Sequence, residues 1–233
     1  MQIVLLCGGL GRRIREIDKF NPKGMIDINN KPFFDYLLKS LKPHNFSNLH
    51  FCFGYKSEIY LSHLKENYAH LNYTYSLENE NELLGTGGAI KNCIDLLDQN
   101  FIIQYGDTIL KLNYEKFFKL HLQNNKLMTM SILNSSKSEE APNLYCYEKS
   151  EGEITCVYNK KNPHKYANFI DYGALVFNKQ TFQMINRRIF DLSDLQEEFT
   201  LKNKSNFYIV DNKYIEIGTP SSLEKAKLEL DDF

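Results

Sequence analysis

The first hundred residues alternate short apolar runs with amphipathic stretches, and this alternation limits the possible folds more than any other feature. Strands are predicted where the runs have strand length, at residues 3–6, 49–53, 71–77 and 101–104. Helices are predicted where apolar residues recur at helical spacing, at residues 32–41, 57–68 and 87–97. Such alternation favours parallel β-α-β units, so we expect an α/β fold with a mostly parallel sheet covered on both faces.

The second half of the chain is predicted to be richer in strands. Strand-like segments occupy residues 127–133, 145–147, 154–158 and 170–177, with one or two more within 207–217. Helices are predicted at residues 180–189, 192–200 and 221–230, the last with Ser221 or Ser222 as its cap. Ser150-Glu151-Gly152 is expected to join two of the strands. No linker rich in Pro, Gly or Ser separates the halves, so we expect one domain over residues 1–233.

The composition excludes several classes of protein. The chain carries 28 Lys and Arg against 29 Asp and Glu, so no basic field favours nucleic acid or anionic lipid as a partner. No apolar run approaches the roughly 20 residues that a membrane span needs. The N-terminal apolar run lacks a basic flank and breaks at Gly8, which predicts a strand rather than a signal peptide, and a cytoplasmic location.

The five cysteines are scattered along the chain, mostly within apolar stretches, and no C-x-x-C pair is present. They are Cys7, Cys52, Cys93, Cys146 and Cys156. An odd number of such residues predicts reduced, buried thiols without a functional role.

A glycine-rich turn, L-C-G-G-L-G-R-R-I, runs directly from the first predicted strand. Glycines allow successive backbone N–H groups to turn inward and bind an anion, and Arg13 offers a fork that suits phosphate oxygens. Lys23 follows Pro22 and can supply a second cation. The pattern is not the G-x-x-x-x-G-K-[ST] of a P-loop. It is not a dinucleotide fingerprint either, because Ile14 stands where a third glycine belongs. A plain strand–turn–helix with solvated cations is the alternative.

The turn, followed by P-K-G-M at residues 22–25, resembles the signature G-G-x-G-[ST]-R-L…P-K-P-M of the sugar-1-phosphate nucleotidylyltransferases. Three later segments resemble that family's motifs in the same order: L-G-T-G-G-A-I at 84–90, Y-G-D-T at 105–108 and E-I-G-T-P at 216–220. Within the family the chain looks most like the D-glycero-α-D-manno-heptose 1-phosphate guanylyltransferases of bacterial surface-polysaccharide pathways. The resemblance implies a Rossmann-like sheet of the nucleotide-diphospho-sugar transferase type with an added β-rich sugar-binding part.

The implied reaction joins a sugar 1-phosphate to a nucleoside triphosphate, with GTP and the heptose 1-phosphate as first choices and Mg²⁺ as cofactor. Residues 1–110 would then form the nucleotide-binding part and residues 111–233 the sugar-phosphate part with the C-terminal helix. One alternative is a cytidylyl- or uridylyltransferase for a hexose 1-phosphate. Another is a non-catalytic nucleotide-sugar-binding or regulatory subunit. The sequence leaves homo-oligomerisation open.

The resemblance assigns catalytic roles to Arg13, at the β- and γ-phosphates, and to Lys23, at the α-phosphate. Glu78 is placed to accept hydrogen bonds from a guanine, although Glu80 and Glu82 offer the same group. The full set of implied nucleotide-binding residues is Leu6, Cys7, Gly8, Gly9, Gly11, Arg12, Glu78, Gly85, Thr86 and Gly87.

Two carboxylates are implied as metal ligands, Asp107 and Glu216. Glu216 stands where the family has the shorter aspartate, so a direct ligand, a water-mediated ligand and a structural acid remain open. The implied sugar-phosphate residues are Gly106, Lys160, Lys161, Asp171 and Gly173. Either lysine can meet the sugar phosphate. Asp171 replaces the usual amide, which suits a polyol or indicates a different sugar.

Overall fold

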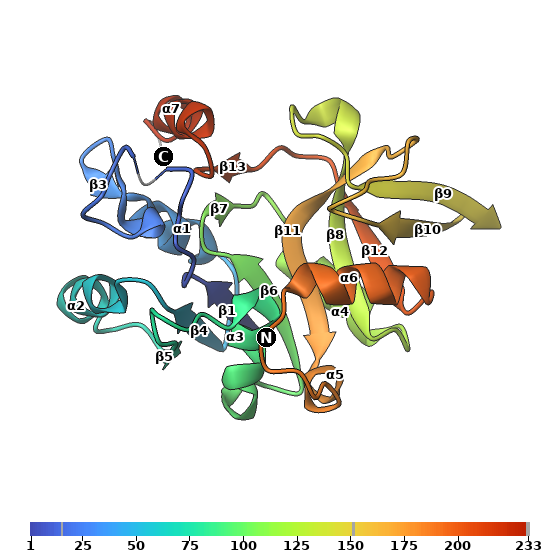
Figure 1. Ribbon diagram of the computed structural model, residues 1–233, viewed down its shortest axis with the longest axis horizontal. Helices are drawn as coiled ribbons and strands as arrows, with labels where there is room; N and C mark the ends of the chain where they lie inside the picture. Colours follow the sequence, from blue (N-terminus) through green and yellow to red (C-terminus); the bar gives the residue numbers. More distant parts are fainter. Residues whose placement is uncertain (15, 151, 232–233) are drawn as a thin grey trace. The chain divides into compact units, whose positions relative to one another are not determined.

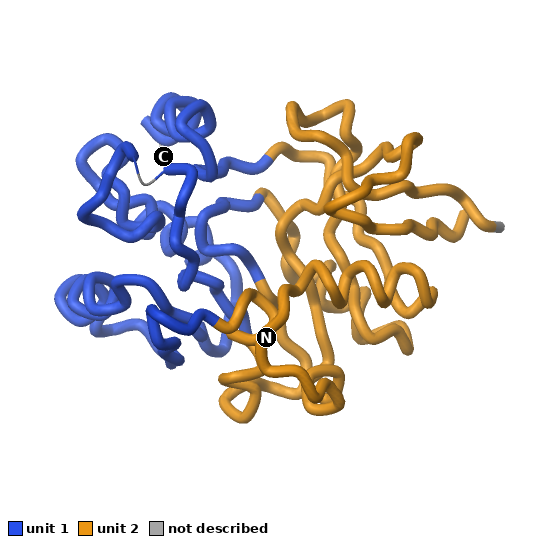
Figure 2. Tube along the Cα trace, viewed as in Figure 1, with its two compact units in different colours: residues 1–83, 104–110, 214–233 blue, residues 84–103, 111–213 orange. Residues whose placement is uncertain are grey.

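The computed structural model describes residues 1–14, 16–150 and 152–231. The chain forms two compact units, coloured separately in Figure 2. Unit 1 comprises residues 1–83, 104–110 and 214–233, and unit 2 comprises residues 84–103 and 111–213. These units are defined by packing, so the functional division at residue 110 stays a prediction. Among the described residues, no helix combines the length and apolar character that crossing a membrane requires.

Unit 1 contains the parallel sheet that the sequence predicts. Its strands are β1 (Gln2–Leu6), β4 (Asn48–Phe53) and β5 (Tyr73–Leu77), hydrogen-bonded in that order and all parallel. The connections are α1 (Phe33–Leu41) and α2 (Ser57–Asn67), as shown in Figure 1. On α1, Phe33, Phe34 and Leu37 are fully buried, because the helix turns its apolar face inward.

Short elements complete unit 1. They are the 3₁₀ turn η1 (Lys23–Met25), the hairpin β2 (Asp27–Ile28) and β3 (Lys31–Pro32), β7 (Thr108–Ile109), β13 (Ile215–Glu216) and α7 (Pro220–Glu229). The predicted cap of the last helix, Ser221 or Ser222, is wrong by two or three residues. Thr219 is the N-cap and forms a reciprocal capping box with Ser222, while Pro220 occupies the first helical position.

Unit 2 is built around an antiparallel pairing of two long strands, with one parallel strand beside it. β11 (Phe169–Asn178) pairs antiparallel with β8 (Met128–Asn134), and β12 (Ser205–Val210) pairs parallel with β8. β9 (Leu144–Ser150) and β10 (Glu153–Tyr158) form a hairpin whose predicted turn residue Glu151 lies outside the described residues. Its helices are α3 (Gly85–Asn92), α4 (Tyr114–Leu122), α5 (Lys179–Gln183) and α6 (Leu192–Leu201), with the 3₁₀ turns η2 (Ile94–Leu96) and η3 (Ser135–Lys137). β6 (Asn100–Tyr105) contributes residues to both units.

Two predicted helices have different bounds in unit 2. The helix predicted over 180–189 ends at Gln183, and the chain beyond it is held in an irregular path by the Lys91 ammonium, which donates to the carbonyls of Ile185 and Arg187. The helix predicted over 87–97 begins two residues earlier, at Gly85, and ends at Asn92. Tertiary contacts thus override local periodicity after α5.

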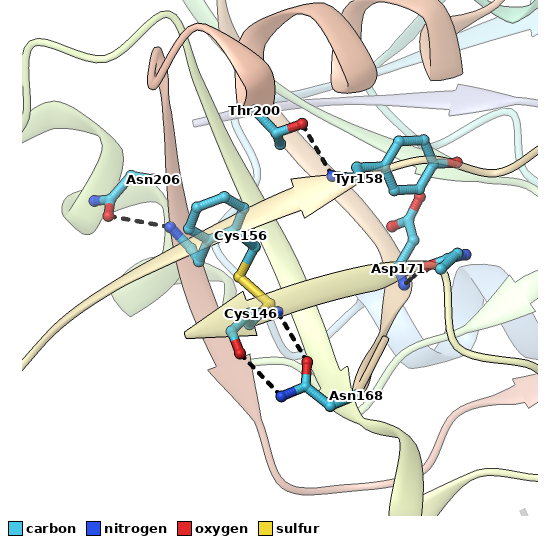
Figure 3. Close-up of a disulfide and its surroundings, with 9 residues drawn as sticks. Cys146, Cys156, Tyr158, Asn168, Asp171, Thr200 and Asn206 are labelled. Carbon is cyan, nitrogen blue, oxygen red and sulfur yellow. Dashed lines mark hydrogen bonds between the residues drawn. A yellow bond between two sulfur atoms is a disulfide. The ribbon is translucent and has the colours of Figure 1, made fainter. Parts of the chain in front are cut away.

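The expectation that all five cysteines are reduced is wrong for two of them. Cys146 on β9 and Cys156 on β10 form a disulfide, shown in Figure 3. The two residues lie directly opposite each other in the antiparallel register, which brings their side chains to the same face of the hairpin. Sequence spacing carries no such pairing information. Cys7, Cys52 and Cys93 are buried and not disulfide-bonded, as expected.

Removing this cross-link should destabilise the protein. For Cys146→Ser/Cys156→Ser we expect the free energy of unfolding to fall by about 2–3 kcal/mol, because the bond closes a short loop in the unfolded chain. Denaturant unfolding without reductant measures this, and wild type with reductant is the matched control. Thiol titration of the unfolded, unreduced wild type should give three thiols. Five would contradict the pairing.

Candidate functional site

The glycine-rich turn leaves β1 at Leu6 and packs against the segment that follows β4. The Cys7 amide donates to the Cys52 carbonyl at 2.9 Å, and the Tyr55 amide donates to the Gly8 carbonyl at 3.3 Å. A Cβ built on Gly8 would lie 3.0 Å from the Gly54 amide nitrogen, so only glycine permits this approach. By contrast, no described atom lies within 4 Å of a Cβ built on Gly9.

The residues after Gly9 turn the chain and expose two cations. Gly11 has φ +58°, a left-handed conformation that favours glycine. Arg12 and Arg13 follow it, and both are exposed. The glycine-rich turn and its two adjacent cations therefore lie together within unit 1, and their binding of an anion stays a prediction.

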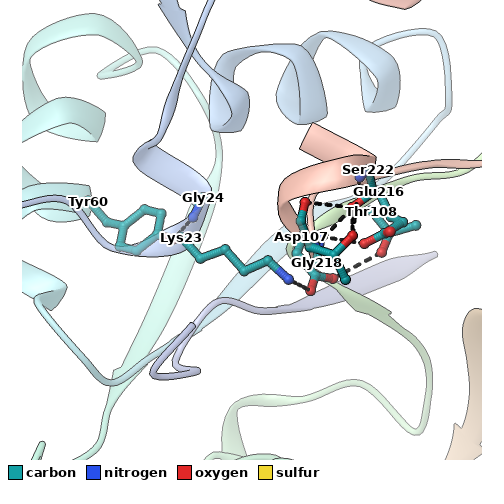
Figure 4. Close-up of polar contacts among 9 residues, drawn as sticks. Lys23, Gly24, Tyr60, Asp107, Thr108, Glu216, Gly218 and Ser222 are labelled. Carbon is teal, nitrogen blue, oxygen red and sulfur yellow. Dashed lines mark hydrogen bonds and ion pairs between the residues drawn. The ribbon is translucent and has the colours of Figure 1, made fainter. Parts of the chain in front are cut away.

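Lys23 is held in place by the aromatic core of unit 1 (Figure 4). The neighbouring Gly24 amide donates to the Tyr60 hydroxyl at 3.0 Å, and a Cβ on Gly24 would meet that oxygen at 2.5 Å. Tyr60 is itself buried and packs against Phe53 with ring centroids 4.8 Å apart. Glycine at position 24, where the resembled signature has proline, is thus explained by the close approach of Tyr60.

The Lys23 ammonium forms an ion pair with the Asp107 carboxylate, with Nζ and Oδ2 2.5 Å apart. The side chains are 15% and 35% exposed, so the pair is only partly screened by water. Burial alone would raise the pKa of Asp107. The Lys23 charge, together with hydrogen bonds from Lys23 and Thr108, outweighs burial and lowers that pKa below its ordinary value. Asp107 is therefore a carboxylate at neutral pH.

Glu216 lies beside this pair. β13 pairs antiparallel with β7, which sets Glu216 opposite Thr108, and the Ile217 amide donates to the Asp107 carbonyl at 3.2 Å. The Glu216 carboxylate accepts a hydrogen bond from the Gly218 amide. A Cβ on Gly218 would lie 3.3 Å from Lys23 Nζ and against the Glu216 carboxylate. The structure thus brings together Lys23, Asp107 and Glu216, although any two of them are at least 84 residues apart in the sequence.

This donor set fits a hard divalent cation. Each carboxylate keeps lone pairs that its protein hydrogen bonds leave unused, and such ions favour one or two carboxylates together with phosphate oxygens.

Gly106, which the resemblance assigns to the sugar phosphate, is closely packed against the residues at the end of β1. Its amide donates to the Leu6 carbonyl at 3.0 Å, and a Cβ there would collide with Leu6 and Cys7. Gly106 thus allows the chain that leads from β6 to Asp107 to pass close to the end of β1.

Of the three candidate acids for base recognition, Glu78 is the one at the glycine-rich turn. Its Oε2 lies 3.0 Å from a Cβ built on Gly8. Glu80 is engaged elsewhere, because its Oε1 accepts the Lys56 amide at 2.5 Å. Glu82 is exposed, and its backbone amide donates a hydrogen bond to the Asn79 carbonyl, which closes a short turn.

In unit 2, the second glycine segment begins α3 instead of forming a separate loop. Gly85 has φ +75°, and Cβ atoms on Gly85 and Gly87 would collide with the carbonyl and the ring of Phe190. Thr86 is tied to Asp191, which accepts from its amide at 3.1 Å and its hydroxyl at 3.3 Å. Close packing against residues 190–191 therefore accounts for these glycines, and their contact with a nucleotide stays a prediction.

The predicted sugar residues of unit 2 lie on β11 and just after β10. Gly173, with φ +101°, interrupts the pairing of β11 with β8, and its amide donates to Asp171 Oδ1 at 3.0 Å. Burial raises the pKa of Asp171, and this outweighs the opposing effects of two hydrogen bonds and of the Lys160 charge. Lys160 therefore lies within electrostatic reach of Asp171. For Lys161, the structure shows instead that its backbone amide donates to Asn159 Oδ1 at 3.1 Å.

Two residues that position the site escape the sequence analysis. Tyr60 anchors Gly24, and Gln196 donates to Asp171 Oδ2 at 2.7 Å. Gln196 carries a readable signal, since it interrupts an apolar helix face formed by Leu192, Leu195 and Phe199. Tyr60 carries none, because a tyrosine on an apolar face is ordinary.

The arrangement matches a known family. The family model for nucleotidyl transferases matches residues 2–232. This chain belongs to the nucleotidyl transferase family. The D-glycero-α-D-manno-heptose 1-phosphate guanylyltransferases of Aneurinibacillus thermoaerophilus and Campylobacter jejuni are 30% and 28% identical. The first match covers 100% of both chains, and the second covers 94% of this chain and 96% of the relative.

Solved structures agree on the fold. The crystal structure of HddC from Yersinia pseudotuberculosis, complexed with GMP-PN, superimposes with a TM-score of 0.75 and 24% identity over 99% of each chain. The predicted fold class, a mostly parallel sheet flanked by helices, is thereby confirmed. Members of the family act on a nucleotide and a sugar phosphate and generally use a divalent metal ion.

Removing the Lys23 charge should affect turnover far more than folding. For Lys23→Ala we expect kcat to fall by about 10²–10³-fold, as when one preorganised donor to a reacting group is lost. Pyrophosphate release measures kcat and thermal unfolding measures stability. Lys42→Ala, a substitution of an exposed lysine after α1, is the matched control. Turnover equal to wild type in Lys23→Ala would contradict the role assigned to Lys23.

Proposed function

We propose that the protein is a guanylyltransferase that joins D-glycero-α-D-manno-heptose 1-phosphate to GTP, releasing pyrophosphate, in the cytoplasm and for surface-polysaccharide synthesis. The observation that carries the proposal is the cluster of Lys23, Asp107 and Glu216 beside the glycine-rich turn of unit 1. Membership of the nucleotidyl transferase family and the two heptose 1-phosphate guanylyltransferase relatives support it.

In the proposed reaction a phosphate oxygen of the sugar 1-phosphate attacks the α-phosphorus of GTP in line. The bond from that phosphorus to the bridging oxygen of the β-phosphate breaks, and pyrophosphate leaves with the electron pair. The attacking phosphate is already anionic, so no side chain has to remove a proton. The chain's task is therefore to bring two polyanions together and to stabilise charge on the leaving group.

Each charged residue then has a defined task. Asp107 uses one of the three ammonium hydrogens of Lys23 and thereby orients it, so the other two remain for oxygens of the α-phosphate. Arg13, exposed beside the turn, meets the β- and γ-phosphates. Asp107 and Glu216 would hold Mg²⁺, which supplies Lewis-acid stabilisation of phosphate charge when bound. Backbone amides of Gly8, Gly9 and Gly11 complete the phosphate cradle.

The choice of GTP rests on Glu78. A carboxylate can accept both the N1–H and the N2–H₂ of guanine, and Glu78 is the acid that lies against the glycine-rich turn. On the sugar side, Lys160 is favoured over Lys161 as the partner of the sugar phosphate, because it lies near Asp171. Asp171 and Gly173 would line the sugar ring.

Pyrophosphate release tests the reaction and the substrates together. We expect release with Mg²⁺, GTP and the heptose 1-phosphate, and little release when CTP, UTP, ATP or dTTP replaces GTP or when a hexose 1-phosphate replaces the heptose. Chelation of divalent ions should abolish it. Release with a different pair would contradict the proposed substrates while keeping the reaction, and nucleotide binding without release from any pair would contradict the reaction.

A second experiment tests base recognition. For Glu78→Gln we expect the KM for GTP to rise by about 10- to 100-fold, because one charged acceptor facing two donors is lost. ITP, which lacks the N2 amino group, should be a poor substrate of wild type. The variant should raise the KM for ITP less than it raises the KM for GTP. Glu80→Gln is the control, since Glu80 is bound to the Lys56 amide. An unchanged KM for GTP in Glu78→Gln would contradict this role.

A further inference from the structure

The Asp171 carboxylate of unit 2 is held from behind by two donors. The Gly173 amide donates to its Oδ1 at 3.0 Å, and the Gln196 side chain donates to its Oδ2 at 2.7 Å. The Asp171 amide is itself fixed by the Asn143 side chain at 2.9 Å. Asp171 is partly exposed whereas Gln196 is fully buried, so the carboxylate lies between the interior and solvent.

Gln196 is an unusual residue for its position. It lies on the buried face of α6 between Leu192, Leu195 and Phe199, and its exposed fraction is 0%. Its Oε1 has no hydrogen-bond partner among the described residues, and its Nε2 otherwise approaches only the Met130 sulfur, at 3.9 Å. A buried amide that satisfies one end only is costly to the fold. The one strong hydrogen bond that its side chain makes is the one to Asp171.

The groups around Asp171 leave its outward side suited to hydroxyl groups. Lys160 is the nearby cation, and Glu140 and Tyr158 are the other titratable groups within electrostatic reach. Figure 3 shows Asp171 beside Tyr158, whose amide is bound by Thr200 of α6. Each carboxylate oxygen has one inner donor and keeps a lone pair that can accept a second hydrogen bond.

We propose that Gln196 is a positioning residue for sugar selection: it fixes the Asp171 carboxylate so that its two oxygens accept hydrogen bonds from two neighbouring hydroxyls of the sugar 1-phosphate. This inference rests on the proposed function. An amide at position 171 would offer a single acceptor oxygen, so a carboxylate selects a sugar with a vicinal diol at this point. A deoxy sugar would leave a held acceptor unpaired.

Gln196→Met tests the proposal, because methionine keeps the length of the side chain and removes its donor. We expect the KM for the sugar 1-phosphate to rise by about 10- to 50-fold, while the KM for GTP stays within about two-fold of wild type. Discrimination against the matching deoxy sugar 1-phosphate should fall by about ten-fold. Asp171→Asn should show the same pattern and keeps an acceptor for Gln196, which guards against a folding defect in the first variant.

Thr200→Val is the matched control. Thr200 lies one turn further along α6 and binds the Tyr158 amide and the Gln196 carbonyl, so its loss perturbs packing without removing the donor to Asp171. It should lower the melting temperature and leave the KM for sugar and the deoxy discrimination unchanged.

The outcomes separate this inference from the proposed function. An active wild type whose sugar KM and deoxy discrimination are unaltered in Gln196→Met overturns the role of Gln196 alone. A Gln196→Met profile identical to that of Thr200→Val also overturns it. If wild type releases no pyrophosphate with any pair, calorimetric binding of the sugar 1-phosphates decides. Binding weakened by Gln196→Met supports the inference, and no binding to wild type overturns it together with the proposed function.

Discussion

The ion pair between Lys23 and Asp107 is the interaction on which the proposed chemistry of unit 1 depends. It joins the 3₁₀ turn after the glycine-rich segment to the short turn between β6 and β7, and it keeps the pKa of Asp107 low despite burial. Its geometry is set from behind by the hydrogen bond between Gly24 and Tyr60 and by the stacked aromatic core. An ammonium group so fixed does not have to be ordered when a phosphate arrives, which is the physical basis of the catalytic role that we propose for Lys23.

The same design recurs in unit 2 with a neutral donor. Asp171 is fixed by the buried Gln196 and by Gly173, as Lys23 is fixed by Asp107, so in each case a hydrogen-bonded partner orients a charged side chain. The difference is electrostatic. Asp107 has a cation against it and a lowered pKa, whereas Asp171 has only an amide and a more distant lysine, and burial raises its pKa. The first pair suits phosphate and metal ions, and the second suits hydroxyl groups.

Glycines that look alike in the sequence have different physical causes in the structure. Gly9 faces open space within the glycine-rich turn, which leaves room for a ligand there. Gly24 makes room for the Tyr60 hydroxyl, and Gly106 makes room for β1. Gly87 makes room for the Phe190 ring. Some glycines of a motif that resembles a ligand-binding loop are therefore required by close packing. The spacing of the motif cannot distinguish the two causes, because the packing partners lie far away in the chain.

The sequence alone determined the parallel β-α-β order of unit 1, the family and the candidate residues, because hydrophobic periodicity and motif order are local properties. Tertiary structure decided which candidates act together. Strand pairing set Glu216 opposite Thr108, next to Asp107, and placed Glu78 rather than Glu80 at the glycine-rich turn. It also joined Cys146 to Cys156 and put Gln196 behind Asp171. These contacts arise from register and packing between distant segments, and no single segment encodes them.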